Sequence, residues 1–156
     1  MRSGAEQNAW EEAFLHGAPD APLARKVLGA LQDLVQVDVE LLIRDVNERT
    51  ITGRFADHLR PRFPHWDVDC EYNRDDHRVK KVDGRIVVPD IIVHRRGTPE
   101  NFLVVEVKKS NTDEPDEEDL EKLRIFKNSH LGYLYALFVK LIVGSQGPGV
   151  QKFQWV

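Results

Sequence analysis

The sequence lacks the features that mark several classes of protein. Cys70 is its only cysteine, which excludes an internal disulfide and a zinc site built from cysteines. No apolar run approaches the roughly 20 residues that a membrane-spanning helix needs. The chain starts MRSGAEQNAWEEAF, which is polar and acidic, so no signal peptide is expected. Together these absences favour a cytoplasmic protein.

Length and composition indicate one globular domain. A chain of 156 residues that is 41% hydrophobic is large enough to bury a sizeable core. The net charge of −4 argues mildly against a nucleic-acid partner, but the charge is unevenly distributed. Residues 44–109 hold fourteen Lys or Arg against twelve Asp or Glu, whereas the segments on either side are acidic. This pattern is compatible with a phosphate-bearing substrate and does not require one.

The stretch Arg85–Ser110 is the most informative part of the chain. It contains two apolar runs around a polar turn at Arg95–Asn101, which predicts a β-hairpin. Each run carries an acid, Asp90 in the first and Glu106 in the second. A roughly symmetric register sets the two acids opposite each other, whereas a slip of one residue would put them on opposite faces. Burying both acids is costly, and a hard divalent cation would make them compatible.

The side-chain alternation of a strand assigns the lysines that follow Glu106. Lys108 lies two residues after Glu106 and shares its face, whereas Lys109 points to the other face. His94 shares the parity of Asp90 but lies four residues away. We interpret His94 as a hydrogen-bonded or exposed histidine in preference to a metal ligand.

A helix is predicted over Asp45–Arg60 because Ile51, Phe55 and Leu59 recur every four residues. Glu48 precedes Ile51 by three residues and lies on the same stripe. Two interpretations stay open for Glu48. It can cap the helix, in a capping box with Asp45 or through the helix dipole, or it can lean toward a metal site at the end of the sheet.

The remaining segments alternate between helices and strands. Residues 5–15 predict a short helix, and Asp20 is expected to cap a second helix that starts near Pro22. His65–Asn73 alternates as a half-buried strand, with Trp66, Val68, Cys70 and Tyr72 on one face and Asp67, Asp69 and Glu71 on a wet face. The acidic segment after Ser110 leads into a helix through Leu120 and Leu123, and Tyr133–Val143 predicts a buried strand. Asn73–Gly84 is a charged loop or weak hairpin, and Val150–Val156 is an edge strand.

This order predicts an α/β fold with a mixed central β-sheet flanked by helices. The whole chain, residues 1–156, is expected to be a single domain. Within it, residues 1–43 form a helical N-terminal accessory that could serve as a dimerisation surface. Residues 45–143 form the core, and residues 144–156 form a C-terminal turn and edge strand.

Pro89-Asp90, followed sixteen residues later by Glu106-Val107-Lys108, resembles the signature of the PD-(D/E)XK nuclease superfamily. The segment from Asn47 to Asp75 also resembles uncharacterised bacterial members of that superfamily. The resemblance covers residues 45–143 and implies a restriction-endonuclease-like core, in the order helix, three strands, helix, strand. The motif alone is short, and its context, on neighbouring strands after a helix that carries an acid, strengthens it.

The resemblance implies a metal-dependent nuclease that hydrolyses phosphodiester bonds, with DNA as the expected substrate. Asp90 and Glu106 would bind Mg²⁺, or Mn²⁺ in its place, with Glu48 supporting a second metal ion or a metal-bound water. Lys108 would complete the catalytic set by orienting or deprotonating the attacking water or by stabilising charge on the phosphate, and we favour positioning over a base role. Arg74 and Lys122 are candidates for contact with the nucleic-acid backbone.

Two other classes stay open. One is a catalytically inactive module with a nuclease-like fold that binds nucleic acid or a protein partner. The other is a structural or oligomerising protein, for instance a homodimer, in which the acids simply pair with Lys and Arg. Binding of Mg²⁺ or Mn²⁺ would separate the enzyme from both alternatives.

Overall fold

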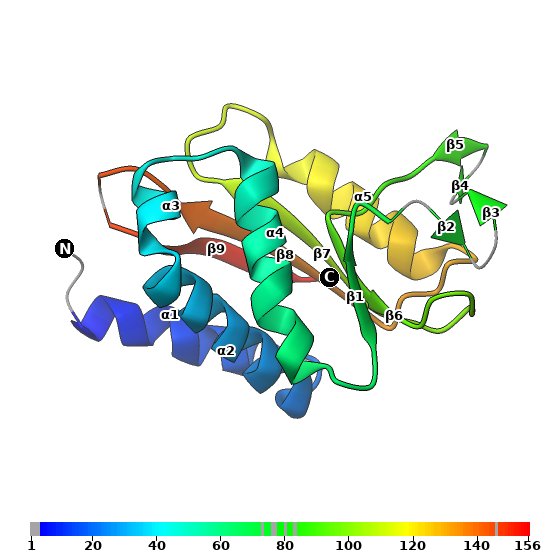
Figure 1. Ribbon diagram of the computed structural model, residues 1–156, viewed down its shortest axis with the longest axis horizontal. Coiled ribbons are helices and arrows are strands. Elements are labelled where there is room, and N and C mark those ends of the chain that lie inside the picture. Colours follow the sequence, from blue (N-terminus) through cyan, green and yellow to red (C-terminus); the bar gives the residue numbers. More distant parts are fainter. Residues whose placement is uncertain (1–3, 73, 76–77, 80, 83, 146) are drawn as a thin grey trace.

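The protein folds into three layers, with a central five-stranded β-sheet between two layers of helices (Figure 1). The computed structural model describes residues 4–72, 74–75, 78–79, 81–82, 84–145 and 147–156. Its helices are α1 (Gly4–His16), α2 (Ala21–Val37), α3 (Val39–Ile43), α4 (Glu48–Leu59), the 3-10 helix η1 (Arg60–Arg62) and α5 (Asp116–Asn128). The sheet strands are β1 (Asp67–Cys70), β6 (Ile91–His94), β7 (Asn101–Lys109), β8 (Tyr135–Ile142) and β9 (Gly149–Trp155).

The sheet is mixed and follows chain order, β1-β6-β7-β8-β9. The pairs β1–β6, β6–β7 and β8–β9 are antiparallel, and the pair β7–β8 is parallel. The parallel pair requires a crossover, and α5 supplies it. The expected α/β class with a mixed sheet flanked by helices is therefore confirmed.

Side-chain alternation along β7 divides the buried residues into two clusters. Leu103, Val105 and Val107 face α1–α4 and belong to the larger cluster, whereas Val104 faces α5 and belongs to the smaller one. Leu120, Leu123 and Phe126 give α5 the apolar stripe that covers the smaller cluster. The helix α5 therefore lies on the face of the sheet that also carries Glu106 and Lys108, because these residues have the parity of Val104.

The N-terminal helices form as expected, and they are integral to the larger core. The side chain of Asp20 caps α2 by accepting from the backbone N–H of Leu23 at 2.8 Å. Seven residues of α2 are buried, and they pack in the same cluster as Ile51, Phe55 and Leu59 of α4. No helix in the described part of the chain is long and apolar enough to cross a membrane.

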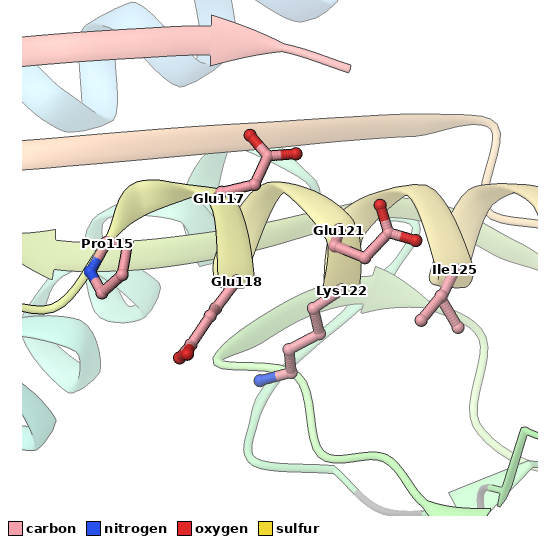
Figure 2. A pocket seen from close by; sticks show the side chains of 6 residues that line it. All are labelled: Pro115, Glu117, Glu118, Glu121, Lys122 and Ile125. Atoms are coloured by element: carbon pink, nitrogen blue, oxygen red, sulfur yellow. The ribbon is translucent and has the colours of Figure 1, made fainter.

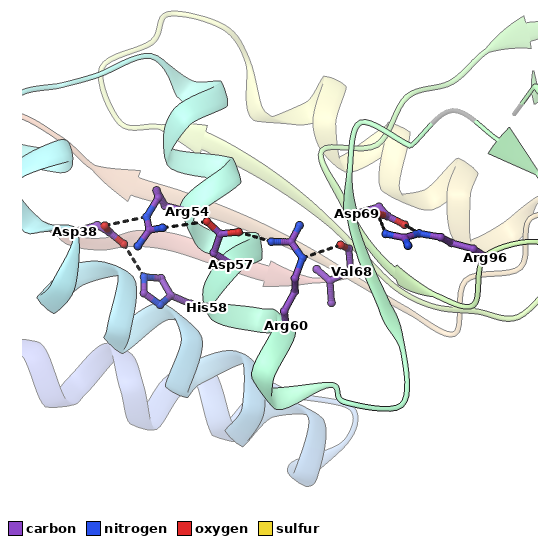
Figure 3. A network of polar contacts seen from close by, with 8 residues as sticks. All are labelled: Asp38, Arg54, Asp57, His58, Arg60, Val68, Asp69 and Arg96. Carbon is purple, nitrogen blue, oxygen red and sulfur yellow. Dashed lines mark hydrogen bonds and ion pairs between the residues drawn. The ribbon is translucent and has the colours of Figure 1, made fainter.

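A chain of ion pairs joins the end of α2 to α4 (Figure 3). Asp38 accepts hydrogen bonds from Arg54 at 3.0 Å and lies 2.6 Å from Nε2 of His58. Arg54 also pairs with Asp57, which in turn contacts Arg60. Burial alone would raise the pKa of Asp38, but its bonds to His58 and Arg54 lower it. The network ties the C-terminal half of α4 to the end of α2.

The first predicted strand is shorter than expected, and one of its faces was assigned wrongly. The strand β1 ends at Cys70 because Glu71 adopts a left-handed conformation with φ of 49°. This bend interrupts the alternation, so Tyr72 packs in the smaller cluster against His94, away from Val68 in the larger one.

Short antiparallel pairs follow this first strand, which agrees with the weak hairpin expected there. They join β2 (Arg74–Asp75) to β3 (Arg78–Val79) and β4 (Lys81–Val82) to β5 (Arg85–Ile86). The other residues of this segment, 73, 76–77, 80 and 83, lie outside the described residues.

Candidate active site

Asp90 and Glu106 lie side by side at one end of the β6–β7 pair. Because Ile91 pairs with Val105, the antiparallel register brings Asp90 opposite Glu106 one residue further on. The backbone N–H of Asp90 donates to Oε1 of Glu106 at 3.3 Å, and Oδ2 of Asp90 accepts from the backbone N–H of Val107 at 2.8 Å. The symmetric register expected for the hairpin therefore holds.

Glu106 is the more deeply buried of the two acids, with only 2% of its side chain exposed. Burial raises its pKa well above the ordinary value, and both the charge of Asp90 and a hydrogen bond to Asp90 raise it further. Nζ of Lys122, on α5, lies 3.0 Å from Oε1 of Glu106 and opposes this shift. Two acids thus lie together in a poorly solvated place where ionising both is costly, and a bound cation would offset that cost.

Lys108 is anchored away from the two acids. Its Nζ lies 3.0 Å from Oδ2 of Asp119 and donates to the carbonyl oxygens of Glu114 at 3.3 Å and Pro115 at 3.0 Å. Burial alone would lower the pKa of Lys108, but the hydrogen bond and charge of Asp119 raise it. An ammonium with three acceptors stays protonated, which disfavours a general-base role for Lys108.

Glu48 lies at the N-terminal end of α4, close to the same end of the sheet. Asn47 is the helix cap and accepts from the backbone N–H of Thr50 at 2.8 Å, so of the alternatives for Glu48 the capping box with Asp45 does not form. Instead, Oε2 of Glu48 accepts from the backbone N–H of Lys109 at 3.3 Å. Partial burial of its carboxylate raises the pKa of Glu48, although the residue as a whole is exposed, and the charge of Asp90 adds to this shift.

Lys109 and His94 have the structural roles expected for them. Nζ of Lys109 lies 2.9 Å from Asp45 on the α4 side of the sheet, and His94 is buried with Nε2 2.7 Å from Asp69. In these contacts the two side chains pair with Asp45 and Asp69, and not with Asp90.

A pocket of about 300 Å³ opens beside Asp90, between α4 and the end of β1. Arg49 stands at this pocket and donates twice to Oε1 of Glu71, at 3.1 and 3.3 Å. The residues that line it are Glu48, Arg49, Thr52, Gly53, Cys70, Glu71 and Asp90. The pocket gives a small group access to Asp90 from the α4 side of the sheet.

The donor groups at this site suit a magnesium ion better than a metal ion whose ligands are all protein side chains. Among the described residues, no three His, Cys, Asp or Glu side chains are grouped closely enough to hold a metal ion, so Glu48, Asp90 and Glu106 do not form a three-acid cluster. Magnesium is commonly held by one or two carboxylates and keeps several waters. The two adjacent carboxylates of Asp90 and Glu106 fit this pattern, and their mutual repulsion is what a cation would relieve.

Reasoning from the sequence did not select Asp119 and Arg49, which both lie near this site in the structure. Asp119 and Lys122 are three residues apart on α5 and therefore share a side of the helix, which was a usable signal. Arg49 follows Glu48 directly, but its contact with Glu71 depends on the bend after β1. Arg74 lies in β2, and the position of its side chain lies outside what the structure describes.

Comparison with known proteins adds no further assignment. No family model, no curated protein and no solved structure matches this chain.

Proposed function

We propose that this protein is a metal-dependent nuclease that hydrolyses phosphodiester bonds of nucleic acid, with DNA as the expected substrate. The observation that carries the proposal is the pair of hydrogen bonds that sets Asp90 beside Glu106 at one end of β6 and β7, one from the backbone N–H of Asp90 to Glu106 and one from the backbone N–H of Val107 to Asp90. Glu106 is buried and Asp90 is half-buried, so two carboxylates that repel each other here are costly to the fold, and a bound divalent cation would offset this cost. The pair also stands in the Pro-Asp and Glu-x-Lys pattern of the PD-(D/E)XK nucleases.

The order of elements supports the same proposal. The chain runs α4, β1, β6, β7, α5 and β8 through the core, which agrees with the order of helix, three strands, helix and strand that the resemblance implies. In this order the hairpin carries both acids, and the helices on either side supply Glu48 and Lys122.

In the proposed reaction, Asp90 and Glu106 would hold the cation through their carboxylate oxygens. Bound Mg²⁺ would lower the pKa of a coordinated water and neutralise charge on the phosphate. Lys108 is protonated and lies on the same face of β7 as Glu106, so its ammonium would position water or stabilise the charge that develops on the phosphoryl oxygens. To do so it must release Asp119. Glu48 would orient a water at the pocket beside Asp90.

The direct test is cleavage of single-stranded and double-stranded DNA, with RNA in parallel, in the presence of Mn²⁺ or Mg²⁺. We expect the wild-type protein to cut at least one substrate, EDTA to abolish cutting, and Asp90→Asn and Glu106→Gln to be inactive. Glu100→Gln is a suitable control because Glu100 is exposed and pairs with Arg95 away from these acids. Equal cutting by wild type and Asp90→Asn would point to a contaminating nuclease and contradict the proposal.

A second candidate is the inactive binding module, and the two lysine contacts favour it. Lys122 pairs with Glu106, and Lys108 is fully engaged by acceptors of α5 and its preceding loop. In such a module these ion pairs would be permanent. Binding of DNA without cleavage, and without any heat of binding on titration with Mn²⁺, would support this candidate over the enzyme.

A further inference from the structure

The ion pair between Lys122 and Glu106 joins two side chains with very different solvent access. Only 2% of the Glu106 side chain is exposed, whereas 31% of the Lys122 side chain is exposed, and Nζ lies 3.0 Å from Oε1. A buried carboxylate without a counter-charge is strongly destabilising. Lys122 therefore supplies a positive charge that offsets part of the cost of burying Glu106 beside Asp90.

The surroundings of Lys122 allow it to leave Glu106. It lines an open depression of about 450 Å³ on the surface of α5, together with Glu118 and Glu121 (Figure 2). Glu118 precedes Lys122 by four residues, and a Glu four residues before a Lys is the favourable arrangement for an ion pair on a helix surface. A released Lys122 ammonium thus has an acidic partner on the exposed side of the same helix.

Lys108 differs from Lys122 in this respect. Only 5% of its side chain is exposed, and its ammonium has three acceptors in Asp119, Glu114 and Pro115. Between Lys108 and Lys122, Lys122 is therefore the one whose ion pair can be exchanged at low cost.

We propose that Lys122 is a built-in counter-cation for Glu106 that a divalent metal ion displaces. The ammonium and the metal ion compete for Oε1 of Glu106, and metal binding moves Lys122 toward the exposed face of α5. This inference rests on the proposed metal site of Asp90 and Glu106. It makes Lys122 a positioning residue that keeps the metal-free site folded and weakens its affinity for metal.

The competition is measured by calorimetric titration of Mn²⁺ into the wild type and Lys122→Met, which keeps the apolar stem and removes the charge. We expect Lys122→Met to bind Mn²⁺ about tenfold more tightly, as is typical of a coupling between two sites. Its melting temperature in EDTA should be below that of the wild type, and Mn²⁺ should raise it by more than it raises that of the wild type. Arg124→Met is the matched control, because Arg124 lies on the same helix and pairs with Glu117 and Glu121.

The outcomes separate this inference from the proposed function. If the wild type and Lys122→Met bind Mn²⁺ equally, and Glu106→Gln does not bind it, the metal site stands and the competition is wrong. An equal gain in affinity in Arg124→Met would also overturn the competition, because the gain would then reflect net charge alone. If none of the proteins binds Mn²⁺, both proposals fail.

A measurement on the unmodified protein avoids any dependence on how Lys122→Met folds. Carbon-13 NMR of the lysine ε-methylene groups during titration with Mg²⁺ should show a change at Lys122 and a much smaller one at Lys127, whose Nζ donates to the carbonyl of Val156. A titration that shifts the carboxyl signals of Asp90 and Glu106 and leaves Lys122 unchanged would overturn the inference.

Discussion

Asp90 and Glu106 hold each other in place across the end of the β6–β7 hairpin. The backbone of Asp90 donates to Glu106, and the carboxylate of Asp90 accepts from the residue that follows Glu106. Glu106 lies within β7 and Asp90 directly precedes β6, so the pairing of these two strands sets the positions of both acids. A site built in this way is pre-organised, which reduces the reorganisation needed when a ligand binds.

Replacement of Lys108 tests both its catalytic and its structural role. Lys108→Ala should lower DNA cleavage by about 100- to 1,000-fold, as loss of one charge-stabilising group typically does. It should also lower the free energy of unfolding by about 2–3 kcal/mol, because it leaves Asp119 and two carbonyls without their donor. Cleavage kinetics and urea unfolding measure the two effects. Lys152→Ala is the control, since the exposed ion pair of Lys152 should be worth less than about 1 kcal/mol.

If Lys108→Ala shows the expected decrease in the free energy of unfolding but cleaves DNA as fast as the wild type, Lys108 has a structural role only. The contact of Lys108 with Asp119 is not visible in the sequence, so the expected loss of stability follows from the structure alone.

Asp90→Asn should stabilise the protein in the absence of metal. The negative charge of Asp90 raises the pKa of Glu106, so its removal relieves repulsion at a buried site, while the amide oxygen of Asn can still accept from Val107. We expect a gain of about 1 kcal/mol in EDTA, visible as a higher melting temperature. Addition of Mn²⁺ should stabilise the wild type and leave Asp90→Asn unchanged. A lower melting temperature for Asp90→Asn in EDTA would contradict the repulsion.

Asp69 should make the free energy of unfolding depend on pH in the acidic range. Burial alone would raise its pKa, but hydrogen bonds from Arg96 and His94 lower it well below the ordinary value of 3.8. An acid with a lowered pKa stabilises the fold above the pKa of the unfolded chain, and this contribution is lost as the pH falls through the folded pKa. Asp69→Asn should therefore cost about 2 kcal/mol at pH 7 and less at pH 3.

Urea unfolding at pH 7 and pH 3 checks this difference. Glu40→Gln is the control, because Glu40 forms an exposed pair with Arg44 and should change stability little at either pH. An equal cost of Asp69→Asn at the two pH values would show that its charge does not contribute.

Gly53 offers a stabilising substitution beside the site. It lies inside α4, and a methyl group added there would meet no atom within 4 Å. Gly53→Ala should raise the free energy of unfolding by about 0.5–1 kcal/mol, because alanine restricts the unfolded chain and favours the helix. Thermal unfolding measures this gain. A loss of stability would mean that the pocket beside Asp90 is narrower than the structure indicates.

Local patterns predicted the positions that depend on neighbours in sequence. The register that pairs Asp90 with Glu106 follows from a hairpin with a symmetric turn, and the burial of Leu120 and Leu123 follows from helical periodicity. The contact of Lys122 with Glu106 depends on how α5 is rotated over the sheet, and packing of the whole domain sets that rotation. No local pattern in the sequence specifies it.

Backbone conformation limited the prediction in one place. The alternating polar and apolar residues after His65 predicted a strand through Asn73, but Glu71 takes a positive φ that any residue other than glycine rarely adopts. The bend turns Tyr72 to the α5 side and brings Glu71 to Arg49. The alternation of polar and apolar residues carries no signal for this bend.

The most direct test of the central claim is the stoichiometry and affinity of Mn²⁺ binding, measured by calorimetry on the wild type, Asp90→Asn and Glu106→Gln. If Asp90 and Glu106 together hold a divalent ion, the wild type will bind Mn²⁺ and each substitution will abolish or greatly weaken binding, while Glu100→Gln binds as the wild type does. Wild-type protein that binds no Mn²⁺, or either substituted protein that binds it with wild-type affinity, would contradict the claim.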